Sequence, residues 1–139
     1  MSDLIIIRGI PGSGKSTMAQ KLLNSNEVDV HIEADMYHVV DGVYEWNAKN
    51  VHDAHIWCQN HTYMELAKNK RVVVSNTFTT IKELKPYFEI AEKFNIVPKV
   101  IHCKGNFGNI HDVPEATLIK MKERFQEDIS SLYRDPTYV

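Results

Sequence analysis

Glycines, a lysine and two hydroxyl side chains are concentrated near the start of the chain, in the segment GIPGSGKST from Gly9 to Thr17. The order Gly9-x-x-x-x-Gly14-Lys15-Ser16 matches the phosphate-binding pattern G-x-x-x-x-G-K-[ST]. Glycines permit positive φ angles and let a phosphate approach the backbone, whose successive N–H groups form an anion-binding nest. Lysine supplies a cation to β- and γ-phosphates, and a serine hydroxyl is a ligand for Mg²⁺. The segment predicts a site for a nucleoside triphosphate with magnesium.

We expect this loop to hold the nucleotide and Ser16 to hold the metal. A plain glycine-rich turn would explain the glycines, but not Lys15 and Ser16 together. A dinucleotide fingerprint is disfavoured, because Thr17 stands where G-x-G-x-x-G needs its last glycine. The residues expected to contact the nucleotide are Gly9, Ile10, Pro11, Gly12, Ser13, Gly14, Lys15, Ser16 and Thr17.

Asp35 is the candidate for the acid that acts on the group receiving the phosphate. A GTPase needs a D-x-x-G switch, which the chain lacks, and a motor ATPase needs an acid where RVVVSN places Ser75 and Asn76. Kinases are the remaining large class, and they use one acid near the acceptor hydroxyl and cations near the transferred phosphoryl group. Asp35 would orient that hydroxyl and accept its proton. A helix N-cap or loop aspartate is an equally good interpretation of the residue taken by itself.

Strand and helix patterns alternate around these residues. Strands are predicted at 4–8, 28–35, 71–76 and 97–104, and helices at 17–24, 50–70, 80–95 and 115–133. This order predicts an α/β protein with the P-loop NTPase fold, a parallel sheet of four to five strands with helices on both faces. Ligands bind such sheets at the carboxyl ends of the strands. We therefore expect Asp35, at the end of the second strand and next to the first, to face the loop.

Composition indicates an ordinary globular protein. The 139 residues predict one domain spanning 1–139, and only four of its sixteen basic residues are arginine in a chain of net charge −2. The overall basic surplus of a nucleic-acid binder is missing, although a local basic groove is compatible with these numbers. Two cysteines without metal-ligand spacing fit a reducing compartment. No apolar run approaches the roughly twenty residues of a membrane span. We expect a cytoplasmic protein without membrane contact, and its oligomeric state is left open.

Several segments occur in the order found in one known family. They are RGIPGSGKST, AD at Asp35, DGVYEWN, AHIWCQ, SNT, LKPYFEIA and HDVPEATLIKMKERFQ. In these segments, which run through nearly the whole chain, the sequence resembles the AAA-type ATP-binding family that includes polynucleotide 5′-hydroxyl kinases and related small P-loop kinases. The resemblance implies ATP and Mg²⁺, with phosphoryl transfer to a hydroxyl, often a nucleic-acid 5′ end. It implies that Lys15 and Ser16 are the phosphate and magnesium residues and that Asp35 is the acceptor base.

The chain departs from the family pattern at three places. Ser75 stands where the family usually has aspartate, no second acid or basic residue follows Asp35 directly, and Gly108 stands about where a lid arginine is expected. A lid arginine can contribute several orders of magnitude in rate. Either Lys104 or Arg124 substitutes for it, or turnover is slow, or the chain is a nucleotide-binding regulatory module with little transfer activity. A small-molecule or nucleoside kinase is a further alternative.

Other side chains allow two interpretations each. Tyr44 and Trp46 could stack on a base or pack over the sheet. Arg124 could reach ATP or lie on a solvated helix face. Asn76 and Thr77 could contact water or acceptor, or only shape a turn. The helical histidines His52, His55 and His61 are expected to be solvated or hydrogen-bonded, since no carboxylate or cysteine completes a metal set with them.

Overall fold

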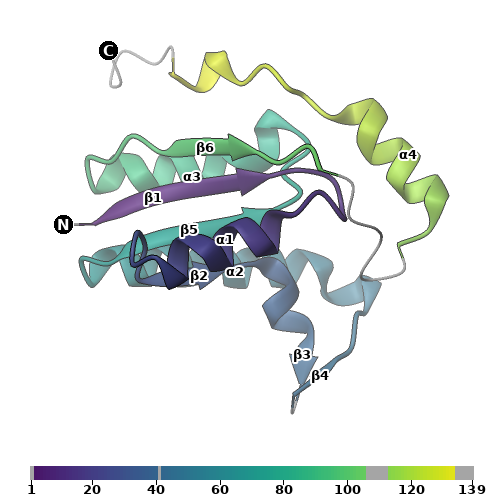
Figure 1. Ribbon diagram of the computed structural model, residues 1–139, viewed down its shortest axis with the longest axis horizontal. Coiled ribbons are helices and arrows are strands. Elements are labelled where there is room, and N and C mark those ends of the chain that lie inside the picture. The colour runs from purple at the N-terminus through teal and green to yellow at the C-terminus, as the bar shows by residue number, and fades with distance from the viewer. Residues whose placement is uncertain (1, 41, 106–112, 134–139) are drawn as a thin grey trace.

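A parallel sheet forms the centre of the molecule. The computed structural model describes residues 2–40, 42–105 and 113–133, and within these ranges four parallel strands form one sheet in the order β2-β5-β1-β6 (Figure 1). The strands are β1 (Asp3–Arg8), β2 (Val30–Ile32), β5 (Arg71–Asn76) and β6 (Lys99–His102). In register, Ile7 of β1 lies beside Ser75 of β5 and Ile101 of β6. The parallel α/β architecture predicted from the sequence is confirmed.

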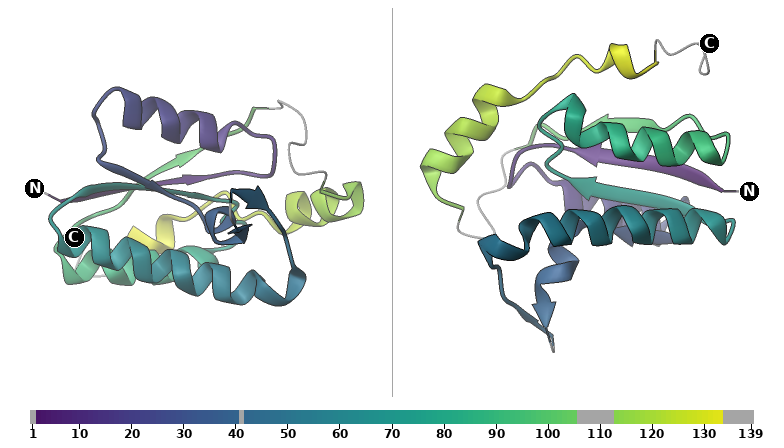
Figure 2. Two further views of the ribbon diagram at one scale, coloured as in Figure 1. Left: turned by 90° about the horizontal axis from the view of Figure 1, so that it is seen from below. Right: turned by 180° about the vertical axis from the view of Figure 1, so that it is seen from behind.

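Helices cover both faces of this sheet. Helix α1 (Lys15–Asn24) lies on one face, and α2 (Val51–Ala67) and α3 (Ile81–Lys93) lie on the other (Figure 2). Because side chains alternate along a strand, each strand feeds both layers of the core. On the α1 side, Ala19 belongs to one cluster with the strand residues Ile5, Ile7 and Val73. On the other side, α2 and α3 residues belong to a cluster with Leu4, Ile6, Ile32, Val72 and Val74.

The second strand is shorter than predicted and lies elsewhere in the sheet. It ends at Ile32 instead of Asp35, because the chain turns into the 3₁₀ helix η1 (Ala34–His38). The backbone N–H of Ala34 donates to Asn76 Oδ1 at 2.8 Å, which ties this turn to the end of β5. Strand β5 separates β2 from β1. The prediction that Asp35 ends a strand next to the first one is therefore wrong, although Asp35 does lie at the carboxyl end of the sheet.

A small antiparallel hairpin follows η1. Its strands are β3 (Val39–Val40) and β4 (Val43–Tyr44), and it projects from the body of the molecule before η2 (Ala48–Asn50) leads into α2 (Figure 1). Gly42 in its turn has φ 80°, which a residue with a side chain rarely adopts. Trp46, just beyond β4, is 58% exposed. The alternative in which Tyr44 and Trp46 pack over the sheet is not what the structure shows.

The predicted C-terminal helix over 115–133 is broken. Helix α4 (Glu115–Arg124) ends at Arg124, the chain then runs extended, and a 3₁₀ turn, η3 (Ser130–Tyr133), follows. The Phe125 ring leaves the helix to stack on His102 at 4.6 Å between centroids, and the Arg8 guanidinium lies 4.3 Å from its centre. Ile129 and Leu132 then reach the core cluster on the α3 side. The apolar residues after Arg124 are buried by an extended segment that packs beside β6 and α3, and not by a continuous helix.

Candidate nucleotide-binding site

The glycines of the loop after β1 have different tasks. Gly12 and Gly14 have φ angles of 82° and 95°, as expected of residues that shape an anion nest. Gly9 does not have a positive φ. A Cβ there would collide with the Ser13 hydroxyl and the backbone carbonyl of Cys103, so close approach is what requires glycine. The Gly9 N–H donates to the Thr77 carbonyl at 3.2 Å, which fixes the start of the loop to the end of β5.

The amino end of α1 is open to an anion. Its N-cap is Gly14, which has no side chain to cap the helix, and no acidic residue lies in the first turn. The first N–H groups of a helix and its dipole then present positive charge to the loop. The Ser13 hydroxyl is buried and has no hydrogen-bond partner among the described residues. These groups fit a phosphate chain.

Lys15 opens this helix and points back over the loop. Its Nζ donates to the Ile10 carbonyl at 3.0 Å. Burial lowers the pKa of Lys15 from its ordinary value, and the nearby carboxylates of Glu33 and Asp35 oppose that shift. The lysine and both acids are therefore close enough to interact, although they come from different elements. Pro11 lies half-buried within the loop, and Thr17 is exposed on the first turn of α1.

Ser16 contacts an acid that sequence reasoning missed. Its hydroxyl donates to Glu33 Oε2 at 2.9 Å. The Ser75 hydroxyl donates to the same oxygen at 2.9 Å, and His31 Nε2 lies 2.7 Å from Ser75 Oγ and 3.5 Å from Glu33 Oε2. The signal was present in the sequence, because Glu33 shares the polar face of the predicted strand with His31 and Asp35. A hydroxyl with a carboxylate beside it suits Mg²⁺, which prefers hard oxygen ligands and is usually held with phosphate and water.

Asp35 lies half-buried in the first turn of η1. The Tyr44 hydroxyl of the hairpin donates to Asp35 Oδ1 at 3.3 Å. Burial, with the Asp35 charge and this hydrogen bond, raises the pKa of Tyr44 to about 12. Tyr44 therefore stays a neutral donor at ordinary pH and links the projecting hairpin to the candidate base.

Other predicted residues have mainly local contacts. Asn76 holds the η1 turn through Ala34, and its side-chain amide lies 3.6 Å from Cys58 Sγ. Arg124 Nε donates to Thr79 Oγ1 at 3.0 Å, so its described contact is with the start of α3 and not with the loop. Lys104 is exposed. Gly108, which stands about where a lid arginine is expected, lies outside the described residues, so the departure at the lid stays a prediction.

Residues 4–106 match the sequence profile of the family described as AAA domain. The match spans the loop, Glu33, Asp35 and the end of β5. The chain belongs to the AAA domain family.

Known relatives of this AAA domain include kinases. It is 29% identical to human NEDD4-binding protein 2 over 91% of the chain and 8% of that protein. It is 27% identical to the bifunctional polynucleotide phosphatase/kinase of Schizosaccharomyces pombe over 89% of the chain and 30% of that enzyme. The chain thus spans less than a third of either relative. A gluconokinase structure from Sinorhizobium meliloti aligns with TM-score 0.63 at 18% identity, covering 96% of this chain and 78% of the other, and shows the same fold.

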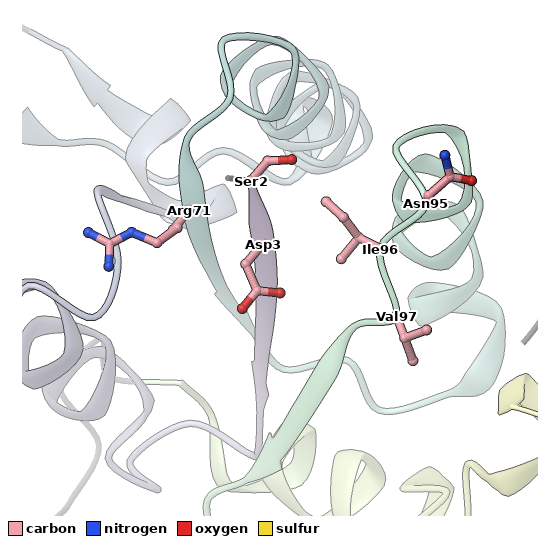
Figure 3. Close-up of a pocket in the computed structure, with 6 residues that line it drawn as sticks. All are labelled: Ser2, Asp3, Arg71, Asn95, Ile96 and Val97. Carbon is pink, nitrogen blue, oxygen red and sulfur yellow. The ribbon is translucent and has the colours of Figure 1, made fainter.

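Two further regions of the AAA domain do not join this site. A depression of about 480 Å³ lies at the opposite end of β1, where Arg71 points away from Ile96 and Val97 and pairs with Asp29 at 2.9 Å (Figure 3). His61 Nε2 lies 3.5 Å from Glu65 Oε1, one turn further along α2. Within the described ranges, no group of three histidine, cysteine or acidic side chains is arranged to hold a metal. No helix there is long and apolar enough to cross a membrane.

Proposed function

We propose that the chain is an ATP-dependent phosphotransferase that passes the γ-phosphate to a hydroxyl group. The observation that supports this most directly is the meeting of three groups at one end of the sheet. Lys15 and Ser16 begin α1 beside an open helix terminus, and Asp35 lies near enough to influence the pKa of Lys15. In such a site Lys15 would bind β- and γ-phosphate oxygens and Ser16 would hold Mg²⁺, which would neutralise charge on those oxygens. Asp35 would accept the proton of the acceptor hydroxyl.

The acceptor we propose is a nucleic-acid 5′-hydroxyl end or a nucleotide. Two observations support this class. One relative, at 27% identity, is named a polynucleotide phosphatase/kinase. Exposed aromatic rings also lie near Asp35, Tyr44 of the hairpin at 38% and Trp46 just beyond it at 58%, and aromatic rings of this kind stack on bases. The test is transfer of labelled γ-phosphate from ATP to DNA and RNA 5′-hydroxyl ends, nucleotides, nucleosides and sugars in parallel. Tight ATP binding with transfer to none of them would favour a nucleotide-binding regulatory module instead.

ATP binding itself is tested with Lys15→Ala. Wild-type protein should be stabilised by MgATP by about 2.7 kcal/mol at a hundredfold excess over the dissociation constant, because the ligand binds only the folded state. Lys15→Ala should lose most of that melting shift while the ligand-free melting temperature stays close to wild type. Lys21→Ala, an exposed lysine on the same helix, is the matched control and should keep the shift. An equal shift in Lys15→Ala and wild type would contradict the assignment of the loop.

A further inference from the structure

The end of the central strand β5 has no acid. Phosphate-binding-loop proteins commonly hold Mg²⁺ with the loop serine or threonine and an acid on a core strand. Here β5 ends in Ser75 and Asn76. The carboxylate that contacts the loop serine belongs to Glu33, which follows β2. The acid beside the loop serine is therefore Glu33, which follows β2, the strand next to β5.

Sheet geometry explains how Glu33 arrives there. Ile32 of β2 lies beside Val74 of β5, and both face the core on the α2 and α3 side. Glu33 and Ser75, one residue further along each strand, therefore face the α1 side, where the helix begins with Lys15 and Ser16. The contact between Ser16 and Glu33 thus follows from strand pairing and alternation.

The hydrogen bonds on Glu33 assign a direction to the Ser16 hydroxyl. A hydroxyl has one proton and two lone pairs. When its proton is donated to Glu33 Oε2, its lone pairs are directed elsewhere and are free to bind a cation. The Ser75 hydroxyl also donates its only proton to Glu33 Oε2. Ser75 Oγ can therefore only accept in its 2.7 Å contact with His31 Nε2, so the imidazole N–H is the donor there.

Glu33 is held in one place. Its side chain is 23% exposed and that of His31 9%, so both are largely shielded from water. The Ser16 and Ser75 hydroxyls both donate to Glu33 Oε2, and His31 Nε2 lies 3.5 Å from the same oxygen. A fixed acceptor of this kind is what a metal-binding hydroxyl requires of its neighbour.

We propose that Glu33 is the positioning residue that directs the Ser16 hydroxyl toward the Mg²⁺ of the bound nucleotide, with Ser75 and His31 holding its carboxylate. This rests on the proposed function, because it assumes that the loop binds a metal–nucleotide complex. It predicts that Glu33 affects metal affinity more than affinity for the nucleotide alone.

The test measures binding and does not depend on phosphoryl transfer. Mn²⁺ is titrated into protein saturated with a non-hydrolysable ATP analogue and followed by electron paramagnetic resonance, and metal-free analogue binding is measured separately. Glu33→Gln, which removes the charge, and Glu33→Ala, which removes the acceptor, should weaken metal binding by 10- to 100-fold, the usual effect of losing such a partner. Metal-free analogue should bind as well as before. Glu89→Gln, an exposed acid on α3, should match wild type.

Unchanged or tighter metal binding in Glu33→Ala would overturn the proposal and would indicate that Glu33 restrains Ser16 instead. Ser75→Ala keeps the carboxylate but removes one donor, and it should weaken metal binding by less than Glu33→Ala. The double variant Glu33→Gln with Ser75→Asp returns a carboxylate to the same place from β5, and it should recover at least tenfold of the lost affinity. No recovery would show that Glu33 acts through local structure, which also contradicts the proposal.

The two levels of inference fail in different ways. If wild type binds the analogue with no dependence on metal, both the proposed function and the role of Glu33 are wrong. If wild type requires metal and transfers phosphate, but the Glu33 variants bind Mn²⁺ like wild type, only the role of Glu33 is wrong.

Discussion

Asp35 and Glu33 are two acids, two residues apart, with different surroundings. Glu33 is enclosed by hydroxyl and imidazole groups, whereas Asp35 lies half-buried beside the Tyr44 hydroxyl on the hairpin side. These different surroundings support the two proposed roles, in which Glu33 positions the metal ligand Ser16 and Asp35 acts on the acceptor hydroxyl.

The role of Asp35 is tested with Asp35→Asn, which keeps size and loses the base. Transfer to the preferred acceptor should fall by roughly 10²- to 10⁴-fold, because general-base catalysis contributes that much. Affinity for MgATP, measured by calorimetry, should change little. The exposed Asp53→Asn on α2 serves as the control. A collapse of MgATP affinity in Asp35→Asn would instead place this residue on the metal side.

At the scale of elements, the strap from Phe125 to Tyr133 replaces a predicted helix and connects to the sheet. Phe125 contacts His102 and Arg8, and Arg8 itself donates from Nε and Nη2 to the Phe78 carbonyl at 3.0 and 2.7 Å. Arg8 is 1% exposed and is the last residue of β1, directly before the loop. The strap is therefore coupled to the strand that carries the loop.

Phe125→Ala should destabilise the fold by about 1–3 kcal/mol, the combined worth of an aromatic stack and a cation–π contact. Urea denaturation followed by circular dichroism measures the change. Phe125→Leu keeps apolar bulk and should lose part of that stability. If Phe125→Ala unfolds at the wild-type urea concentration, the strap contributes nothing to the stability of the sheet.

Sequence patterns identified the elements with strong local signals. The strands predicted at 4–8 and 71–76 are present as β1 and β5, and the helix predicted at 80–95 is present as α3, where Thr80 Oγ1 accepts from the Glu83 N–H. What could not be predicted depends on contacts between distant residues. Phe125 has helical spacing with Met121, but its ring instead packs against the Arg8 guanidinium and the His102 ring, which are distant in the sequence. Glu33 lies within the predicted strand 28–35, but only the pairing of β2 with β5 brings it to Ser16.

At the scale of the whole molecule, the core contains a tyrosine that limits stability in alkali. Tyr87 on α3 is 1% exposed, and its hydroxyl lies beside the Cys58 thiol. Burial, followed by the neighbouring Cys58 thiol, raises the pKa of Tyr87 well above its ordinary value. The unfolded chain releases this proton near pH 10 and the folded protein does not. Folded protein therefore holds more protons above that pH, and the free energy of unfolding decreases as pH rises.

Tyr87→Phe should remove much of this alkaline loss. Urea midpoints measured from pH 8 to pH 11 should fall less steeply in the variant than in wild type. At pH 7 the two proteins should differ by no more than about 1 kcal/mol, because the neighbour of the Tyr87 hydroxyl is the Cys58 thiol, a weak hydrogen-bond partner. Exposed Tyr63→Phe is the control and should follow the wild-type curve. Parallel curves for Tyr87→Phe and wild type would assign the alkaline loss to other groups.

The uncapped amino end of α1 predicts that small oxyanions compete with a nucleotide for the loop. Sulfate, inorganic phosphate and pyrophosphate present the same oxygens as the end of a nucleotide, and they would occupy the nest in competition with it. An ATP dissociation constant determined in phosphate buffer or ammonium sulfate would then be inflated in proportion to the anion present. Binding and turnover of this protein are best compared in chloride or acetate buffers of equal ionic strength. Phosphate released by a contaminating hydrolase would register as progressive inhibition.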